Sequence, residues 1–257
     1  MGNDFVEFIQ NIKKLCGIDL ALYKEAQMKR RLISLYEKKG LSSFQQYFRY
    51  IKEEPQGLEE FLDRMTINVS EFYRNAKRWD VLDQKILPRL VSRNGVLKVW
   101  SAACSTGDEP YTLAMLLSKH LQADRYHILA SDIDEAVLNQ ARLGRYHERS
   151  MKELPLYLKE KHFTQNGDYY AIHENLKKNI LFKKQNLLSD SFDTGYDLIV
   201  CRNVMIYFTE EAKDMLYRKF SASMKPGGVL FVGSTEQIFN AAQYGFENED
   251  TFFYKKI

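Results

Sequence analysis

The sequence predicts an α/β protein in which a doubly wound parallel sheet follows a group of helices. Within residues 96–143, short runs of β-branched and aromatic side chains alternate with stretches whose apolar residues recur every three or four positions. Such an alternation builds a parallel sheet through right-handed crossovers. Residues 5–68 carry the helical pattern alone. A chain of 257 residues can bury a full core, so we expect a small helical domain beside a larger α/β domain.

The composition is that of an ordinary soluble globular protein, with 45% hydrophobic and 28% charged residues. The sequence has no apolar run long enough to span a membrane, and its first residues lack the basic start and apolar centre of a secretory signal. The cysteines at positions 16, 104 and 201 have no paired spacing, which favours a reducing compartment over a disulfide scaffold. We therefore expect a cytoplasmic protein without membrane insertion.

The sequence predicts neither a metal site nor a nucleic-acid surface. Its five histidines form no H-E-x-x-H or similar cluster. A net charge of +3 and a pI near 8.5 are modest beside those of nucleic-acid-binding proteins, which usually carry a strongly basic face.

The first two helices are marked by regular apolar spacing. Phe5, Phe8 and Ile12 share one face of a helix that is interrupted at Gly17. A second helix, over residues 23–38, has an apolar side and a basic side. The basic side carries Gln27, Arg30, Arg31, Ser34 and Lys38. Such a side fits a solvated surface, and it also fits a docking surface for an acidic partner.

Polar groups gather among aromatic residues over residues 68–74, where the helical domain joins the α/β domain. Taken alone, this segment fits a helix start with Ser70 as the cap and Arg74 on the surface.

The helical pattern also occupies three further stretches. They run from residue 44 to a break at 53–57, from 58 toward 68, and from 79 to 90.

The loop after the first strand predicts a ligand site. A buried strand over residues 96–100 is followed by small side chains at 101–107 and by a helix that begins near Pro110. Small residues let a ligand approach the backbone, and the first N–H groups of the helix face that ligand. Asp108 and Glu109 would repel a pyrophosphate, and neither G-x-G-x-x-G nor a P-loop is present. The loop therefore favours a cationic ligand that carries a nucleoside.

The second strand supplies a candidate for binding a ribose. It is predicted over residues 127–133 and is followed by a helix over residues 135–143. Asp132 lies at the position from which a carboxylate can accept both hydroxyl protons of a ribose. One acid of this segment fits a simple helix cap instead, and we assign that role to Asp134.

The regular alternation then lapses. Residues 145–158 predict a loop and short helical pieces, whereas residues 162–172 contain Asn-Gly between strand-forming residues, which is typical of a β-hairpin turn. We interpret this stretch as an antiparallel hairpin inserted into the domain. From the residues alone, a surface excursion without a binding role is the more favoured interpretation.

The last part of the chain returns to the parallel sheet. Residues 179–188 predict one strand, and residues 196–208 predict another with its outgoing loop, at the carboxyl edge where open α/β sheets bind ligands. Arg202 in this loop suits an acidic substrate, although an ion pair at the edge of the core fits it too. The remaining elements are a helix capped by Thr209, a turn at 225–228 that ends it, a strand over 229–233, and a terminal antiparallel strand with its turn over 246–254.

Three motifs occur in order along the chain: Trp-Ser-Ala-Ala-Cys-Ser-Thr-Gly-Asp-Glu-Pro-Tyr at 100–111, Ala-Ser-Asp-Ile-Asp at 130–134, and Cys-Arg-Asn-Val-Met-Ile-Tyr-Phe at 201–208. They resemble the successive motifs of the bacterial chemotaxis receptor methyltransferases, the CheR family. The resemblance implies a Rossmann-like class I methyltransferase domain with an inserted small antiparallel β subdomain, preceded by a small all-α domain. It also implies a protein-glutamate O-methyltransferase that uses S-adenosylmethionine, releases S-adenosylhomocysteine and methylates receptors for sensory adaptation.

The resemblance suggests domain boundaries and partners. We expect the all-α domain with its linker over residues 1–77, the methyltransferase domain over 78–257, and the hairpin insertion at about 160–178. In the family the helical domain faces the cytoplasmic methylation helices of chemotaxis receptors, so we expect the basic helix over 23–38 to meet them. Relatives also contact receptors through the β subdomain, and whether this chain does so is left open.

The resemblance further assigns the site. It places Tyr207 close to the transferred methyl group, and it places Asn186 and Leu187 against the adenine. The expected cofactor-binding residues are Asn68, Ser70, Arg74, Glu109, Asp132, Asn186, Leu187, Arg202 and Asn203, and the expected catalytic residues are Tyr207 and Arg202. Ser70 stands where threonine is common in the family, a change that keeps the hydroxyl.

The predicted chemistry depends on positioning. A glutamate with a pKa near 4.3 is already ionised at neutral pH, so no general base is expected. The arginine that holds the substrate carboxylate is left open among Arg74, Arg202, Arg89 and Arg93. A methyltransferase acting on a small carboxylic acid or on RNA is one alternative, and a scaffold that senses the cofactor without turnover is another.

Overall fold

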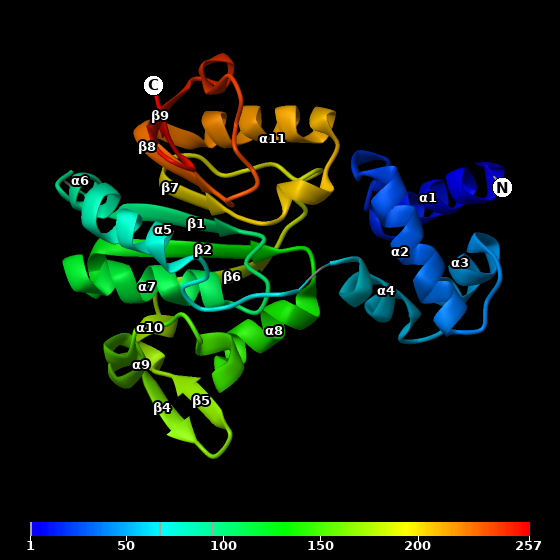
Figure 1. Ribbon diagram of the computed structural model, residues 1–257, viewed down its shortest axis with the longest axis horizontal. Coiled ribbons are helices and arrows are strands. Elements are labelled where there is room, and N and C mark those ends of the chain that lie inside the picture. Colours follow the sequence, from blue (N-terminus) through cyan, green and yellow to red (C-terminus); the bar gives the residue numbers. More distant parts are fainter. Residues whose placement is uncertain (1, 67, 94) are drawn as a thin grey trace.

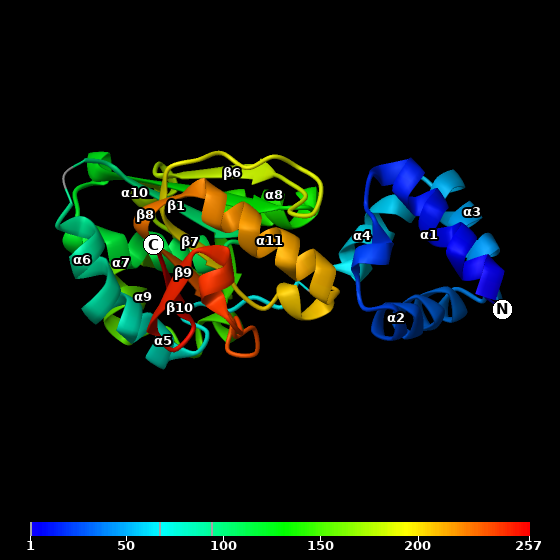
Figure 2. The same ribbon diagram turned by 90° about the horizontal axis from the view of Figure 1, so that it is seen from above.

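The structure is a computed structural model that describes residues 2–66, 68–93 and 95–257. A cluster of helices at the N-terminus lies beside a larger domain built on a twisted sheet (Figures 1 and 2). Within the described residues, no helix has the length and apolar character needed to cross a membrane. The fold class predicted from the sequence is confirmed.

The N-terminal helices pack around one aromatic core. They are α1 (Gly2–Cys16), the short 3-10 helix η1 (Leu20–Leu22), α2 (Glu25–Lys38), α3 (Phe44–Glu53) and α4 (Gly57–Met65). Phe8 lies at the centre, with its ring 5.2 Å from that of Phe44 and 5.9 Å from that of Tyr47. The Ser43 hydroxyl accepts a hydrogen bond from the Gln46 amide and begins α3, as the turn before residue 44 predicts.

The larger domain contains a seven-stranded sheet in the order β6-β2-β1-β7-β8-β10-β9. The strands are β1 (Leu97–Ala102), β2 (Tyr126–Asp132), β6 (Ile180–Lys184), β7 (Tyr196–Cys201), β8 (Met224–Val232), β9 (Phe246–Asp250) and β10 (Phe253–Lys256). The first five strands in the sheet order pair in parallel, whereas β10 is antiparallel to both β8 and β9. The predicted terminal antiparallel strand is therefore confirmed.

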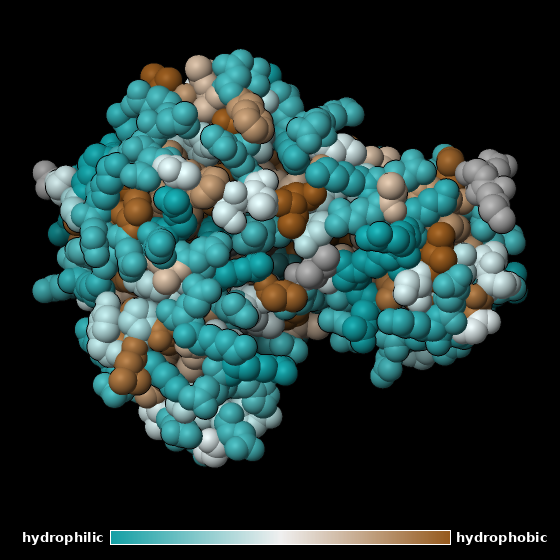
Figure 3. Space-filling view, in the orientation of Figure 1, coloured by the Kyte–Doolittle hydropathy of each residue, from teal (hydrophilic) through white to brown (hydrophobic). Residues whose placement is uncertain are grey.

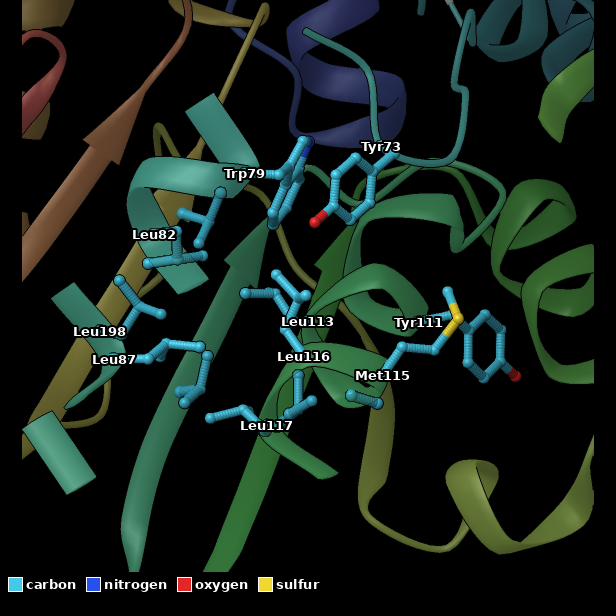
Figure 4. Packing of buried hydrophobic residues seen from close by; sticks show 14 of the residues in the cluster. Tyr73, Trp79, Leu82, Leu87, Tyr111, Leu113, Met115, Leu116, Leu117 and Leu198 are labelled. Atoms are coloured by element: carbon cyan, nitrogen blue, oxygen red, sulfur yellow. The ribbon is translucent and has the colours of Figure 1, made fainter. Parts of the chain in front are cut away.

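Alternation along each strand divides the core between the two faces of the sheet. Val99 packs on one face and Trp100 on the other, and Leu198 and Ile199 repeat the pattern on β7. The first face is covered by α5 (Ala76–Val81), η2 (Leu82–Ile86), α6 (Leu87–Val91) and α7 (Asp108–His120), with α8 (Glu135–Leu143) against β2 and β6. The second face is covered by α11 (Glu210–Ser223) and η6 (Ala241–Tyr244). Figure 4 shows leucines of α7 meeting Trp79, Leu82 and Leu87 over the first face.

A small antiparallel sheet is inserted after α8. Its order is β3-β5-β4, with β3 (Arg145–His147), β4 (Phe163–Asn166) and β5 (Tyr169–Ile172). The short helices η4 (Glu148–Met151) and α9 (Leu156–His162) lie between β3 and β4, and α10 (Glu174–Lys177) lies between β5 and β6. The 3-10 helix η3 (Ala123–Arg125) lies outside this insertion, directly before β2. The predicted hairpin is present, and its turn is formed by Gly167 and Asp168 between the paired Asn166 and Tyr169.

Two local predictions were wrong, and a third is only partly right. Residues 145–147 form a strand because they pair with β5, a contact distant in sequence. Residues 225–228 lie inside β8, which already begins at Met224, but they bulge out of the pairing with β7, since Met224 pairs with Tyr196 and Val229 with Leu198. Ser70 caps no helix, because the next helix starts at Ala76 after an extended segment.

Candidate functional site

A cavity of about 730 Å³ lies between the N-terminal helices and the carboxyl ends of the parallel strands. Figure 3 shows the N-terminal helices as a separate lobe, joined to the larger lobe at a waist. The cavity wall combines side chains of α2 and of residues 68–74 with residues that follow β1, β2, β6 and β7. Every site residue expected from the sequence lines this cavity: Asn68, Ser70, Arg74, Glu109, Asp132, Asn186, Leu187, Arg202, Asn203 and Tyr207.

The loop after β1 folds back onto the end of β2. The Ser105 amide donates a 2.8 Å hydrogen bond to Asp132 Oδ2, and the Cys104 amide donates to the Ser131 carbonyl over 3.0 Å. Ser105 adopts a left-handed conformation with φ of 48°, which costs about 1–3 kcal/mol and persists only where surrounding contacts determine it. Gly107, with φ of 92°, leaves no room for a Cβ, which would lie 2.8 Å from the Cβ of Ala141.

Asp132 and Asp134 accept hydrogen bonds from different backbone groups. Asp132 is only 7% exposed and accepts backbone hydrogen bonds from Ser105 and Asp134. Burial raises its pKa to about 6, against the lowering effect of these bonds. Asp134 caps α8 by accepting from the Ala136 amide over 2.9 Å, which confirms that prediction. Its second oxygen accepts from Asn68 Nδ2 over 3.1 Å and thus ties the interdomain segment to the end of β2.

The two acids at the start of α7 point to different partners. Asp108 accepts from the Thr106 hydroxyl over 2.6 Å and is buried outside the cavity lining. Glu109 accepts from the Ser101 hydroxyl over 2.8 Å and lies 3.7 Å from Arg202 Nη1. Burial raises the pKa of Glu109 to about 7, although the guanidinium opposes this shift. Glu109 therefore supplies a largely buried carboxyl group, 14% exposed, to the cavity wall.

Arg202 is held inside the wall. Its guanidinium carbon lies 5.1 Å from the ring centre of Trp79 and 4.8 Å from that of Phe231. Its Nη2 donates to the Arg74 carbonyl over 2.8 Å, and its Nη1 faces Glu109. From the sequence, Arg202 could bind an acidic substrate or form an ion pair at the edge of the core. The structure contains the ion pair, with Glu109. These contacts fix Arg202 in the cavity wall and leave its guanidinium poorly placed to bind an acidic group that enters from outside.

Two of the four arginines considered for the substrate carboxylate do not line the cavity. Arg89 binds both carboxylate oxygens of Glu249 over 2.7 and 2.8 Å, and Arg93 donates to the Pro226 and Gly227 carbonyls. The two side chains therefore hold α6 and the residues after it against the β8–β9 side of the sheet, and neither is a candidate for the substrate carboxylate. Arg74 lines the cavity and is partly exposed, with Nη1 donating to the Val69 carbonyl over 3.2 Å.

Tyr207 lies where the two lobes touch. Its carbonyl accepts from the Lys24 amide over 2.9 Å, and the Thr209 amide donates to the Leu22 carbonyl over 2.9 Å. Between these bonds the rings of Tyr23 and Phe208 pack edge to face at 5.1 Å. This short antiparallel bridge joins the chain just before α2 to the loop after β7. The segment that begins the basic helix thus lies against the proposed catalytic tyrosine.

The basic side of α2 faces the cavity. Gln27, Arg30, Arg31 and Ser34 all contribute to the wall, together with Lys24 just before the helix. Lys38, which the helical pattern placed on the same side, lies outside this lining. Burial raises the pKa of Tyr207, and the positive charges of Arg31 and Arg74 oppose this rise. One side of the cavity is therefore positively charged.

The structure adds Gln185 to the cavity, a residue that the sequence did not single out. Gln185 is 4% exposed, and its backbone N–H donates to the Asp132 backbone carbonyl over 2.8 Å. The sequence did contain a signal for this residue, because Gln185 is polar and directly follows the strand that ends beside Asp132. Among the described residues, buried polar atoms without a hydrogen-bond partner include Gln185 Oε1, Ser105 Oγ and Arg202 Nε, all from residues of the cavity wall. Each of these three atoms has almost no exposed surface, so a ligand in the cavity would reach it only after the side chain moved.

The residues after β6 form a turn beside the cavity. The Asn186 side-chain oxygen accepts from the Leu188 amide over 3.0 Å, and the Asn186 amide donates to Asp190 over 2.9 Å. Leu187 is 7% exposed and presents an apolar wall. An apolar surface beside an amide group suits a flat heterocycle with polar edges.

The chain is similar to proteins of one family over nearly its whole length. Residues 68–253 match the family described as "CheR methyltransferase, SAM binding domain", and residues 3–66 match "CheR methyltransferase, all-alpha domain". The chain is 46% identical over 257 residues to a "Chemotaxis protein methyltransferase" of Listeria monocytogenes, covering 100% of this chain and 98% of the relative. It is 39% identical over 236 residues to the protein of that name from Borreliella burgdorferi, covering 86% and 83%.

Proposed function

The chain belongs to the CheR methyltransferase family, and on this premise we propose that it methylates glutamate side chains of chemotaxis receptors for sensory adaptation. S-adenosylmethionine is the cofactor, in accordance with the SAM-binding domain over residues 68–253. The products are a glutamate methyl ester and S-adenosylhomocysteine. The observation that carries this proposal is the asymmetry of the cavity, which has the carboxyl groups of Asp132 and Glu109 in the wall of the larger domain and the cations of Lys24, Arg30 and Arg31 in the wall of the N-terminal helices.

The strand ends form the cofactor side. Asp132 would accept the ribose hydroxyl protons, and Asn186 with Leu187 would bind the adenine. Glu109 would place negative charge near the sulfonium, since a cation offsets the cost of ionising a buried carboxyl group. The other residues proposed to contact the cofactor are Asn68, Ser70, Arg74, Arg202 and Asn203, all of which line the cavity.

The arginines form the acceptor side. Lys24, Arg30 and Arg31 present positive charge from the N-terminal lobe, which suits an acidic helix of a receptor. We assign the acceptor carboxylate to Arg74, because it lines the cavity and is partly exposed, whereas Arg202 is occupied by Glu109 and by a backbone carbonyl. Tyr207 lies between the two sides and would orient the carboxylate through its hydroxyl.

The chemistry requires orientation and the exclusion of water. When bound, S-adenosylmethionine supplies an electrophilic methyl group on a positively charged sulfur. A glutamate carboxylate is already ionised at neutral pH, so the chain need not remove a proton. Its residues hold the carboxylate in line and keep the cavity dry, and these effects reduce the entropic and solvation cost of the transfer.

The proposal is tested by asking which acceptor takes up the methyl group. The purified protein is incubated with methyl-labelled S-adenosylmethionine and, in separate reactions, with a cytoplasmic chemoreceptor fragment, total RNA or a small dicarboxylic acid. Label in the receptor fragment that is released by mild alkali supports the proposal. Label in RNA or in the small acid would assign a different acceptor, and cofactor binding without transfer to any of the three would favour a sensor without turnover.

A further inference from the structure

The loop that carries Tyr207 needs support, because it starts in an unfavourable conformation. Asn203 follows β7 with φ of 61°, in the left-handed region, which asparagine adopts more readily than most non-glycine residues. The conformation is still uncommon, and it persists where surrounding contacts determine it. The loop then makes a single 3-10 turn, η5 (Met205–Tyr207), before Phe208. Whatever fixes residues 203–206 therefore sets the position of Tyr207.

A buried carboxylate from another loop makes these contacts. Glu236 is 5% exposed and follows β8. Its Oε2 accepts from the Asn203 amide over 2.7 Å and from the Gly233 amide over 2.8 Å, while its Oε1 accepts from the Ile206 amide over 3.2 Å. Both oxygens are thus bonded to backbone N–H groups at the two ends of the segment that leads to Tyr207.

The sequence around Glu236 makes room for this arrangement. Glu236 closes a turn by donating its amide to the Gly233 carbonyl over 3.0 Å. A Cβ on Gly233 would lie 2.4 Å from Glu236 Oε2 and 2.8 Å from the Asn203 nitrogen. Only a residue without a side chain allows the carboxylate and the Asn203 amide to meet. The glycine and the glutamate therefore act as one unit.

We propose that Glu236 is a positioning residue for methyl transfer, which acts by fixing the backbone of residues 203–206 so that the Tyr207 hydroxyl faces the reacting groups. This inference rests on the proposed function, and it adds a residue that touches neither cofactor nor acceptor, since Glu236 lies outside the cavity lining. The neutral isostere is the sharpest probe. In Glu236→Gln one acceptor oxygen becomes an NH₂ group, which would face a backbone N–H that it cannot bind.

The first test separates turnover from binding. Glu236→Gln should lower kcat roughly a hundred-fold, the cost expected for a displacement of about 1 Å at a reacting group. The loss should exceed any loss of S-adenosylmethionine affinity measured by calorimetry, and Glu236→Asp should recover part of the rate because it keeps both acceptors. Glu247→Gln is the matched control, because Glu247 is exposed and pairs with Lys255 on the outer strands. An unchanged kcat, or a fall that only follows a lower unfolding temperature, would overturn the inference.

The second test asks whether Glu236 acts through Tyr207. In a double-mutant cycle, Glu236→Gln should cost much less in a Tyr207→Phe background than in the wild type, because the hydroxyl to be positioned is already gone. Independent, additive losses would refute the assignment.

A third measurement does not need turnover. Amide hydrogen exchange over residues 203–207 should accelerate in Glu236→Gln and stay unchanged in Glu247→Gln. If the wild type transferred no methyl group, the proposed function would fail, but the exchange experiment would still report on the hydrogen bonds from residues 203–206 to Glu236. If the wild type were active and exchange were unaltered, the role of Glu236 would fail alone.

Discussion

Asp132 and Glu109 are carboxyl groups whose burial works against their charge. Their pKa values are about 6 and about 7 in the free protein, above the ordinary values of 3.8 and 4.5. A bound cation favours the ionised forms, so affinity for S-adenosylmethionine should rise as pH increases from about 5.5 to about 8 and then level off. Calorimetry across this range, in two buffers of different ionisation enthalpy, should also detect proton release near pH 6.5. Affinity that is flat with pH would contradict the assignment of these carboxyl groups to the cofactor side.

The free energy of unfolding of the cofactor-free protein should fall as pH rises, whereas the affinity for S-adenosylmethionine should increase. Because both pKa values are raised in the folded state, the contribution of these groups is fully present below their ordinary pKa values. It is lost as pH rises through about 6 and about 7. The cofactor-free protein should therefore gain stability near pH 8 from Glu109→Gln, and urea unfolding of the two proteins at pH 5 and pH 8 measures the difference.

Removal of the Asp132 carboxylate should affect binding more than chemistry. Asp132→Ala should weaken S-adenosylmethionine binding by about 1–3 kcal/mol, the range for a lost buried hydrogen-bond partner. Asp124→Ala, at an exposed position in η3, is the control. Equal affinities of Asp132→Ala and wild type would remove Asp132 from the ribose site.

Tyr207 should show the reverse behaviour. Tyr207→Phe keeps the ring but loses the hydroxyl, so kcat should fall roughly ten- to a hundred-fold, as for a lost hydrogen bond to a charged group of about 1.5–3 kcal/mol. Cofactor affinity should change little, because the ring still lines the cavity. Steady-state rates at saturating cofactor test this, and a near-normal rate would exclude the hydroxyl from the mechanism.

The basic side of α2 invites a test with a matched pair of substitutions. Arg30 is exposed and lines the cavity, whereas Lys38 is exposed on the same helix but lies outside the lining. Arg30→Glu should raise the KM for a receptor fragment and reduce the salt dependence of binding, and Lys38→Glu should have a much smaller effect. Methylation rates at several fragment concentrations, in low and moderate salt, would show the difference. Equal effects of the two substitutions would mean that net charge, and not this surface, guides the acceptor.

Elements with a strong local pattern could be predicted from the sequence, and elements defined by distant pairing could not. The alternation over residues 96–143 led to β1, α7, β2 and α8 because each has its own periodicity. β3 has only three residues, and its strand character comes from pairing with β5 more than twenty positions later. The start of β8 likewise depends on a distant pair, since Met224 lies opposite Tyr196 of β7.

The candidate site was predictable to the extent that fold topology determines it. Parallel strands end at the same edge of a sheet, so Asp132, Asn186 and Arg202 meet although they are far apart in sequence. The sequence could not reveal that the N-terminal lobe closes this edge, because the bridge between residues 22–24 and 207–209 has no local pattern. The sequence also could not show that Arg202 pairs with Glu109 and donates a hydrogen bond to the Arg74 carbonyl. Burial and partners decide such roles, and both depend on the whole fold.

At the scale of the whole molecule, the account depends on a cavity that holds a sulfonium nucleoside against the strand ends and an acidic helix against α2. The most direct test is to identify the atom that receives the methyl group. A receptor cytoplasmic fragment is incubated with the protein and S-adenosylmethionine, digested, and sequenced by tandem mass spectrometry. The account predicts a methyl group on glutamate carboxylates that is lost in alkali, and that forms more slowly with Tyr207→Phe at saturating cofactor and with Asp132→Ala at low cofactor concentration. A methyl group on lysine, or on any atom that retains it in alkali, would contradict the account.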